Sequence, residues 1–206
     1  MKKIAIVNYG INNIKSIFNA VNQIGYNPIV IENSIDIKNF SCLILPGVGA
    51  FDKGVNNLKS NGIYDQIIEF KNSKKPLLGI CLGMQMLFEK SYEFGMHLGF
   101  GFIDGSVKKI MKKNKLQKIP SIGWFSLVNK KEINPFGIKP NEKFYFIHSY
   151  EAKASRKENV LYKYDNGYSE ITSIVKKDNV TGVQFHPEKS GEVGLKFLKN
   201  YFESVI

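Results

Sequence analysis

Residues 76–88 read PLLGICLGMQMLF and join a strand-like run to a helix-like run. Residues 76–80 are apolar and form a run short enough for a buried strand. Residues 84–88 are mostly good helix formers and place apolar side chains at helical spacing. Between them, residues 79–83 have the form G-x-C-x-G, the thiol version of a nucleophile elbow. The pattern therefore predicts a sharp turn from strand to helix that presents one thiol over a sheet.

Cys81 is the centre of that elbow, and its neighbours have steric reasons to be glycine. The turn strains the backbone, and a β-carbon at position 79 or 83 would collide with the adjacent turn. At the start of a helix, unpaired N–H groups and the helix dipole favour a thiolate. The alternative is that Cys81 is a small buried hydrophobe, as most free cysteines are. The elbow alone leaves both interpretations open, because a catalytic thiol also needs a base.

Composition limits the class of protein. The chain has 206 residues, 43% of them hydrophobic, which suffices for one sizeable core. Cys42 lies in a strand-like run and is expected to be buried, and two cysteines are too few for a disulfide framework. The apolar run that follows Met1 is too short for a signal peptide, and none approaches a membrane span. We therefore expect a cytoplasmic protein with no membrane association.

The formal charge of +11 raises the question of nucleic-acid binding. The lysines are scattered, Arg156 is the single arginine, and no nucleic-acid-binding motif is present. A solvated, lysine-rich surface is therefore the favoured interpretation. A basic patch that faces an acidic partner or a phosphorylated substrate is the alternative.

Strands and helices alternate over the first 90 residues. Strands are expected at 3–7, 27–31 and 42–45, and helices at 14–24 and 63–70. This alternation predicts an α/β fold with a doubly wound, largely parallel central sheet flanked by helices. In such sheets, binding sites gather at the carboxyl ends of the strands, where the elbow and a glycine-rich loop at 46–51 would both lie.

The pattern changes after Lys90. Residues 95–105 are glycine-rich and are expected to form a loop, and a helix is expected from about Val193 to the end. Short strand-like runs lie between them, at 144–147, 160–164, 171–176 and 180–185. No linker divides the chain, so we expect a single domain over 1–206.

His186 is the best candidate for the base. It follows an apolar strand in the sequence QFHPEK, and Pro187 would fix the backbone where the chain leaves the sheet. In an extended chain, His186 and Glu188 point the same way, so the carboxylate can orient the imidazole. The other ring nitrogen is then free to take the thiol proton, which predicts a Cys–His–acid triad of Cys81, His186 and Glu188. The alternative is a histidine hydrogen-bonded near a surface glutamate.

Several motifs together resemble a known family. GICLGMQ at 79–85 and QFHPEKS at 184–190 resemble the class I (triad) glutamine amidotransferases. LPGVGAF at 45–51 and FYFIHSY at 144–150 are similar to the glutaminase subunits of imidazole glycerol phosphate synthase within that family. The similarity extends from about Ile4 to the final helix.

The resemblance implies a mechanism and a set of site residues. Cys81 would attack the side-chain amide of glutamine to form a γ-glutamyl thioester and release ammonia, with His186 moving the proton and Glu188 orienting it. Backbone N–H groups would form the oxyanion hole, after the 48–49 loop has rearranged. The residues implied for the oxyanion hole are Val48, Gly49 and Leu82, and those implied for substrate binding are Gln85, His148, Ser149 and Tyr150. No metal or organic cofactor is implied.

The resemblance also implies a partner, because ammonia loses its nucleophilicity when it is protonated in water. The family passes ammonia through a tunnel to a second subunit, here a (βα)8-barrel cyclase that binds a phosphorylated ribonucleotide, in a heterodimer for histidine biosynthesis. Two motifs depart from the family pattern, Asn8 and Asn12 in the N-terminal turn and Ser121 and Phe125 around the retained Trp124. The partner face is expected to comprise Asn12, Ser121, Trp124 and Phe125.

Three functions therefore stand. The first is the glutaminase subunit of the histidine pathway. The second is a paralogue that supplies ammonia to a synthetase that amidinates a sugar of a surface polysaccharide or glycan. The third is a catalytically inactive interaction subunit, against which the intact set of Cys81, His186 and Glu188 argues.

Overall fold

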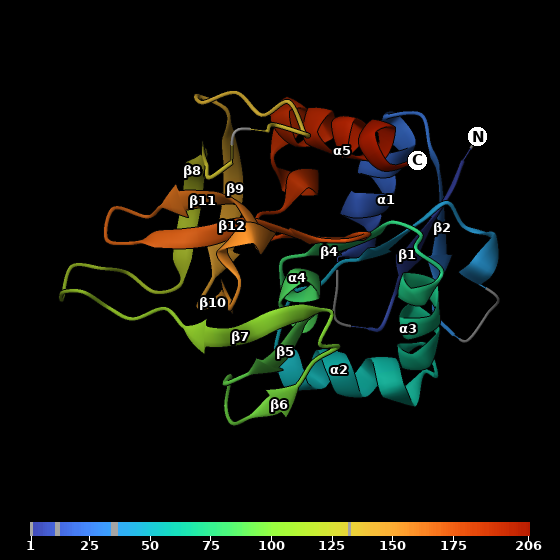
Figure 1. Ribbon diagram of the computed structural model, residues 1–206, viewed down its shortest axis with the longest axis horizontal. Helices are drawn as coiled ribbons and strands as arrows, with labels where there is room; N and C mark the ends of the chain where they lie inside the picture. Colours follow the sequence, from blue (N-terminus) through green and yellow to red (C-terminus); the bar gives the residue numbers. More distant parts are fainter. Residues whose placement is uncertain (1, 11–12, 34–36, 132) are drawn as a thin grey trace.

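A nine-stranded sheet forms the centre of the protein, and a four-stranded sheet lies beside it (Figure 1). The computed structural model describes residues 2–10, 13–33, 37–131 and 133–206. The strands of the central sheet are β1 (Lys3–Val7), β2 (Asn27–Ile31), β3 (Cys42–Leu45), β4 (Leu77–Ile80), β8 (Ser121–Asn129), β9 (Lys143–His148), β11 (Val160–Asp165), β12 (Glu170–Lys177) and β13 (Val180–Val183). The second sheet contains β5 (Phe88–Ser91), β6 (His97–Leu98), β7 (Ile103–Lys109) and β10 (Tyr150–Ala154).

Five α-helices and three short 3-10 turns complete the described part of the chain. The helices are α1 (Ile14–Gln23), α2 (Phe51–Ser60), α3 (Tyr64–Asn72), α4 (Leu82–Met86) and α5 (Gly191–Val205). The 3-10 turns are η1 (Ile37–Asn39), η2 (Lys157–Asn159) and η3 (Pro187–Lys189).

The central sheet is mixed, with a parallel and an antiparallel part. Its order is β2-β1-β3-β4-β13-β12-β11-β8-β9. The pairings from β2 to β13 are parallel, and those from β13 to β9 are antiparallel. The predicted α/β fold with a helix-flanked sheet is confirmed. Four strands of its parallel part, β1 to β4, are those that the alternation of the first 90 residues indicated, and the fifth, β13, comes from the end of the chain.

Two apolar layers cover the two faces of the sheet, and alternate residues of β1 contribute to each. Ile4 and Ile6 belong to the layer that includes α1 and α5, whereas Ala5 and Val7 belong to the layer that includes α2 and α3. The second sheet lies on the α2 side (Figure 1). A fully buried strand reads as a continuous apolar run because both of its faces are covered, which explains the sequence KIAIV.

The structure differs from the sequence prediction in several places. Phe88 lies in β5, where it pairs with Ile103, and not in the helix expected over 84–88, because strand pairing overrides helix propensity. The expected loop at 95–105 contains β6 and the start of β7. The helix α2 was not predicted, and neither were the strands β5, β6, β7, β8 and β10.

The elbow has the steric tightness that its sequence predicts. Cys81 has φ 53° and ψ −107°, a strained conformation for a non-glycine residue. A β-carbon on Gly79 would lie 2.8 Å from the backbone carbonyl carbon of Gly83, and one on Gly83 would lie 1.7 Å from the carbonyl oxygen of Leu45. The helix that follows Cys81, α4, can therefore approach β3 and β4 only without side chains at these two positions.

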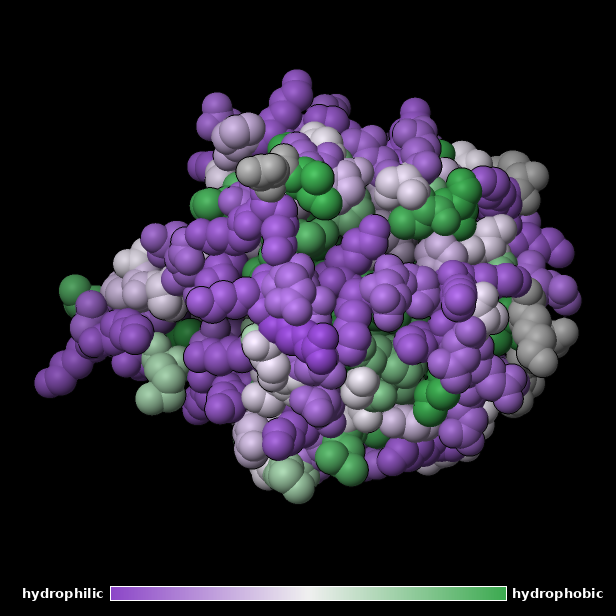
Figure 2. All heavy atoms as spheres, in the orientation of Figure 1, coloured by the Kyte–Doolittle hydropathy of each residue, from purple (hydrophilic) through white to green (hydrophobic). Residues whose placement is uncertain are grey.

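The outer surface is mostly polar on the face shown in Figure 2, where apolar side chains form only small separate patches. This distribution agrees with the lysine-rich surface that the charge of +11 led us to expect. Within the described residues, no helix has the length and apolar character that crossing a membrane requires.

Gly83→Ala is expected to destabilise the protein by about 3 kcal/mol or more, because its β-carbon meets backbone that cannot move aside. The matched control is Gly167→Ala, where φ is +85° but nothing lies within 4 Å of the added carbon. That control should cost only about 1 kcal/mol of backbone strain. Urea unfolding of the two variants measures both values, and equal losses would contradict the steric account.

Candidate active site

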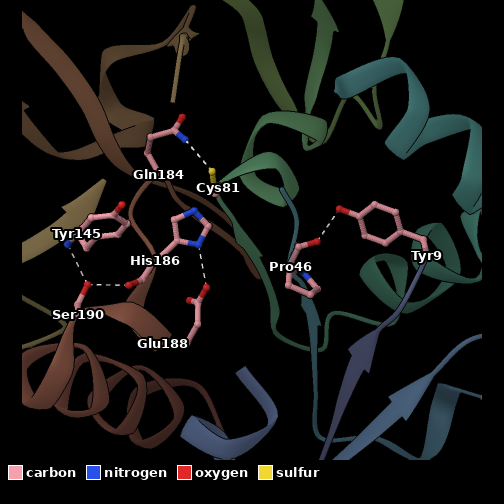
Figure 3. A network of polar contacts seen from close by, with 8 residues as sticks. All are labelled: Tyr9, Pro46, Cys81, Tyr145, Gln184, His186, Glu188 and Ser190. Carbon is pink, nitrogen blue, oxygen red and sulfur yellow. Dashed lines mark hydrogen bonds and ion pairs between the residues drawn. The ribbon is translucent and has the colours of Figure 1, made fainter. Parts of the chain in front are cut away.

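The candidate active site lies where two parallel strands end side by side. Ile80 at the end of β4 pairs with Val183 at the end of β13. The next N–H along, that of Cys81, donates a hydrogen bond of 2.8 Å to the carbonyl of Val183. The chain after β13 therefore passes directly beside the elbow and brings Gln184 and His186 to the thiol (Figure 3).

His186 and Glu188 form a hydrogen-bonded pair. The ring Nδ1 of His186 lies 2.8 Å from Oε1 of Glu188, and both side chains are almost completely buried. The predicted contact exists, but its geometric origin differs from the extended chain that we expected. Pro187 begins η3, and this 3-10 turn folds the carboxylate back onto the ring. The proton on Nδ1 is thereby fixed, and Nε2 is left for the thiol.

Burial and two neighbouring groups, Cys81 and Glu188, act on the ionisation of His186 in opposite directions. Burial alone would lower its pKa, but the neighbouring Cys81 and Glu188 outweigh burial and raise the pKa to about 10. Nε2 makes no hydrogen bond within the described residues, and Cys81 is the group that raises the pKa of the ring most. The arrangement therefore favours a protonated imidazole at His186.

A pocket of about 510 Å³ opens over the thiol. The sequence-predicted residues that line it are Val48, Gly49, Cys81, Leu82, Gln85, His148, Ser149 and Tyr150. The structure thus gathers the residues expected to form the oxyanion hole and to bind substrate around one nucleophile. A slightly larger cavity of about 570 Å³, half of whose lining residues are lysines, contains no cysteine or histidine, so the chemistry points to the smaller one.

The glycine-rich loop at 46–51 is tied down at two points. The buried hydroxyl of Tyr9 donates a hydrogen bond of 2.6 Å to the carbonyl of Pro46 (Figure 3). The N–H of Leu82 donates one of 3.3 Å to the carbonyl of Gly47. The first N–H after the nucleophile is therefore occupied by the loop in this structure, and is not directed at a substrate oxygen.

The end of β9 and the residues that follow it line the pocket, and the side chain of His148 there is buried. Burial lowers the pKa of His148 to about 4, although its hydrogen bond to the Tyr150 carbonyl raises it. His148 is therefore neutral, and its Nδ1 lies 2.7 Å from that carbonyl. Its Nε2 lies 2.7 Å from the hydroxyl of Tyr164. The His148 ring therefore links the Tyr150 backbone to the side chain of Tyr164.

Two polar residues of the site were not predicted from the sequence. Glu93 lines the pocket and accepts a hydrogen bond of 2.7 Å from the N–H of Phe51. Burial raises the pKa of Glu93, partly offset by this N–H. Gln184 is fully buried and its Nε2 lies 3.6 Å from the sulfur of Cys81. Glu93 has no signal in the sequence, and Gln184 was quoted only as part of a motif.

The expected partner face needs a correction. Trp124 is half exposed on β8, but Ser121 is buried and Phe125 packs inward against Phe146 and Tyr164. Residues one apart on a strand point to opposite faces, so Phe125 cannot share the outer face with Trp124, and neither can Ser121. The side chains beside Trp124 on the outer face are Ile122 and, on β9, Tyr145 and Ile147. Asn12 lies outside the described residues.

No group of three or more histidine, cysteine, aspartate or glutamate side chains is placed to hold a metal ion in the described ranges.

A comparison with known protein families identifies the family to which the chain belongs. The family described as glutamine amidotransferase class-I matches residues 5–205. The match covers nearly the whole chain, including the elbow and the segment that carries His186. The protein belongs to the class-I glutamine amidotransferase family.

Its relatives narrow the similarity to one kind of subunit. The chain is 43% identical over 204 residues to the imidazole glycerol phosphate synthase subunit HisH of Wolinella succinogenes, covering 97% of this chain and 98% of that protein. It is 44% identical over 204 residues to the subunit of the same name from Caldanaerobacter subterraneus subsp. tengcongensis, covering 98% of each. In fold it is similar to a chain in the structure of PurLQS from Thermotoga maritima, with a TM-score of 0.72, 23% identity and coverage of 99% and 97%.

Cys81→Ala is expected to lower the pKa of His186 from about 10, because the main source of the upward shift is removed while burial still lowers it. The ring should then lose its proton at a lower pH than in the unaltered protein. NMR titration of the His186 ring measures this. An unchanged titration would mean that the thiol and the imidazole are not coupled.

Proposed function

We propose that this protein is a glutaminase subunit that hydrolyses glutamine through a thioester on Cys81 and passes the ammonia to a synthase partner. The observation that carries the proposal is the buried His186–Glu188 pair that is electrostatically coupled to Cys81, the thiol that lines the pocket. An imidazolium–thiolate pair supplies the nucleophile, and the imidazolium supplies the proton that the leaving ammonia needs. The relatives named HisH support assignment to the synthase that makes imidazole glycerol phosphate, in histidine biosynthesis.

The oxyanion hole is incomplete as the loop now lies. The tetrahedral intermediate needs N–H donors directed at its oxygen, and the N–H of Leu82 is the first candidate. That N–H is released only when the carbonyl of Gly47 turns away. Gly49 already has φ +106°, so rotation of the peptide between Val48 and Gly49 is sterically accessible and would bring a second N–H to the site. In this account the free subunit is a slow enzyme.

The pocket contains polar groups that can hydrogen-bond to glutamine and a carboxylate that can pair with its α-ammonium group. Gln85 donates its amide N–H groups to the carbonyl of Tyr150 and to Gln184, so its own carbonyl oxygen is the atom left for substrate. Backbone groups of Ser149 and Tyr150 line the same wall. Glu93 carries the carboxylate of the pocket, and its charge is complementary to the α-ammonium group of an amino acid.

The outer face of β8 and β9 is the surface proposed for the partner. Ile122, Trp124 and Ile147 expose apolar area there, and Ile147 also lines the pocket over Cys81. A partner seated on these side chains would cover the pocket mouth and receive ammonia without its escape into water. A (βα)8-barrel cyclase is the partner that the HisH relatives support. Ser121 and Phe125 differ from the family pattern, but their side chains point inward. They therefore give no support to a different partner.

The whole chain forms one unit in this proposal, because residues of the site come from both its beginning and its end. The central sheet joins β1 to β13 without interruption in its pairing. We therefore propose a single glutamine amidotransferase domain over 1–206.

The test is the rate of ammonia release from glutamine by this chain alone and with a barrel cyclase subunit carrying its nucleotide ligand. We expect stimulation of about tenfold or more, because completing the oxyanion hole is worth at least that much. The matched control adds the same cyclase to Cys81→Ala, which should release no ammonia.

A lack of stimulation, with Cys81 still labelled by a reactive glutamine analogue, would contradict the histidine-pathway partner. A sugar-amidinating synthetase would then be the acceptor subunit to test. Absence of both labelling and ammonia release would contradict the glutaminase itself.

A further inference from the structure

Gln184 occupies a position that the mechanism so far leaves unexplained. It follows β13 directly, its backbone N–H donates to the carbonyl of Ser173, and its side chain is fully buried. A buried amide carries a cost unless its donors and acceptor are paired. Its side-chain nitrogen lies 3.6 Å from the sulfur of Cys81 (Figure 3).

The orientation of this amide follows from its neighbours. The carbonyl of Tyr150 can only accept hydrogen bonds, so the group of Gln85 that lies 3.1 Å from it must be the NH₂. The same nitrogen of Gln85 lies 3.1 Å from the side chain of Gln184, so the atom of Gln184 that faces it must be the oxygen. The NH₂ of Gln184 is therefore the end that faces the sulfur, and reversing it would place donor against donor.

The side chains behind the Tyr150 carbonyl agree with this orientation of the Gln85 and Gln184 amides. The neutral ring of His148 donates from Nδ1 to the Tyr150 carbonyl, because that carbonyl has no proton to give. The Nε2 of His148 is then an acceptor and pairs with the hydroxyl of Tyr164, which also contacts the hydroxyl of Ser121. The side chains of His148, Tyr164 and Ser121 are buried, and each has a hydrogen-bonding partner. The chain of contacts holds the Gln184 amide in one direction.

We propose that the side-chain amide of Gln184 is a catalytic group that donates a hydrogen bond to the sulfur of Cys81 and holds it as a thiolate. A hydrogen bond to a charged acceptor is stronger than one to a neutral acceptor, so the donor favours the thiolate over the thiol. The thiolate is present before attack on glutamine and forms again when water breaks the thioester. His186 approaches the sulfur through its ring, and Gln184 supplies a second, uncharged donor that never gives up its proton.

The proposal is independent of how His186 acts, because the amide has no role in proton transfer. Gln184 does not line the pocket that would hold glutamine, so its contribution is directed at the sulfur. Its loss should therefore reduce kcat more than it changes KM. A residue that served only the packing of the core would affect stability without changing the reactivity of the thiol.

The experiment measures the rate at which iodoacetamide alkylates Cys81 as a function of pH, with the labelled peptide quantified by mass spectrometry. In Gln184→Met the midpoint of the pH profile should move upward by about one pH unit, the shift expected when a hydrogen bond to a charged group is lost. The kcat for glutamine hydrolysis should fall about tenfold, with a smaller change in KM. Cys42 is fully buried and serves as an internal reference for unfolding.

Two further variants sharpen the test. Gln184→Glu keeps an oxygen for Gln85 and has nearly the same shape, but it places a carboxylate against the sulfur, so the midpoint should move upward at least as far. This variant also serves if Gln184→Met fails to fold. The matched control is Gln117→Met, which removes another buried glutamine, one that accepts from the N–H of Lys113. It should leave the profile unchanged.

An unchanged midpoint in both Gln184 variants would overturn the proposal, and so would an equal shift in Gln117→Met. The inference refines the glutaminase proposed above, but alkylation needs no glutamine. If the protein releases no ammonia and Gln184→Met still shifts the profile, the proposed function fails and this inference stands. If ammonia release is normal and neither Gln184 variant shifts the profile, the reverse holds.

Discussion

The parallel pairing of β4 with β13 is the constraint on which the rest of the site depends. It sets Ile80 opposite Val183, so the residues that follow each strand leave the sheet at the same place. One strand continues into the strained turn at Cys81, and the other continues into Gln184 and His186. The nucleophile and the groups that act on it are 103 and more residues apart in the chain, and this ladder alone brings them together. Any loss of register would separate the thiol from its base.

The same packing that presents the thiol also restrains it. The elbow helix lies so close to β3 that no side chain fits at position 83, and the loop after β3 uses its Gly47 carbonyl to occupy the N–H of Leu82. Tyr9 holds that loop from the side of β1. In the proposed mechanism, a thiol beside an oxyanion hole that is not yet formed suits a subunit whose product is of use only to a partner. We infer that the loop, and not the triad, is where partner control would act.

Local motifs allowed much of this to be predicted from the sequence, and the failures have a common cause. The elbow and the QFHPEK segment specify their own geometry within a few residues, so Cys81 and the His186–Glu188 pair were found. Residues whose role depends on distant neighbours were not predicted. Glu93 and Gln184 make their contacts in the site only in the tertiary fold. The sequence analysis did not predict β8 as a strand. It therefore could not use the alternation of side chains along a strand, which turns Phe125 inward.

The central claim is that one thiol does the chemistry, and its most direct test is glutamine-dependent ammonia release by Cys81→Ala beside Cys42→Ala. Both cysteines are buried, but only Cys81 lines the pocket. The account predicts that Cys81→Ala folds, because the change is small, and releases no ammonia above background. Cys42→Ala should retain the activity of the unaltered protein. Ammonia release that persists in folded Cys81→Ala would contradict the account.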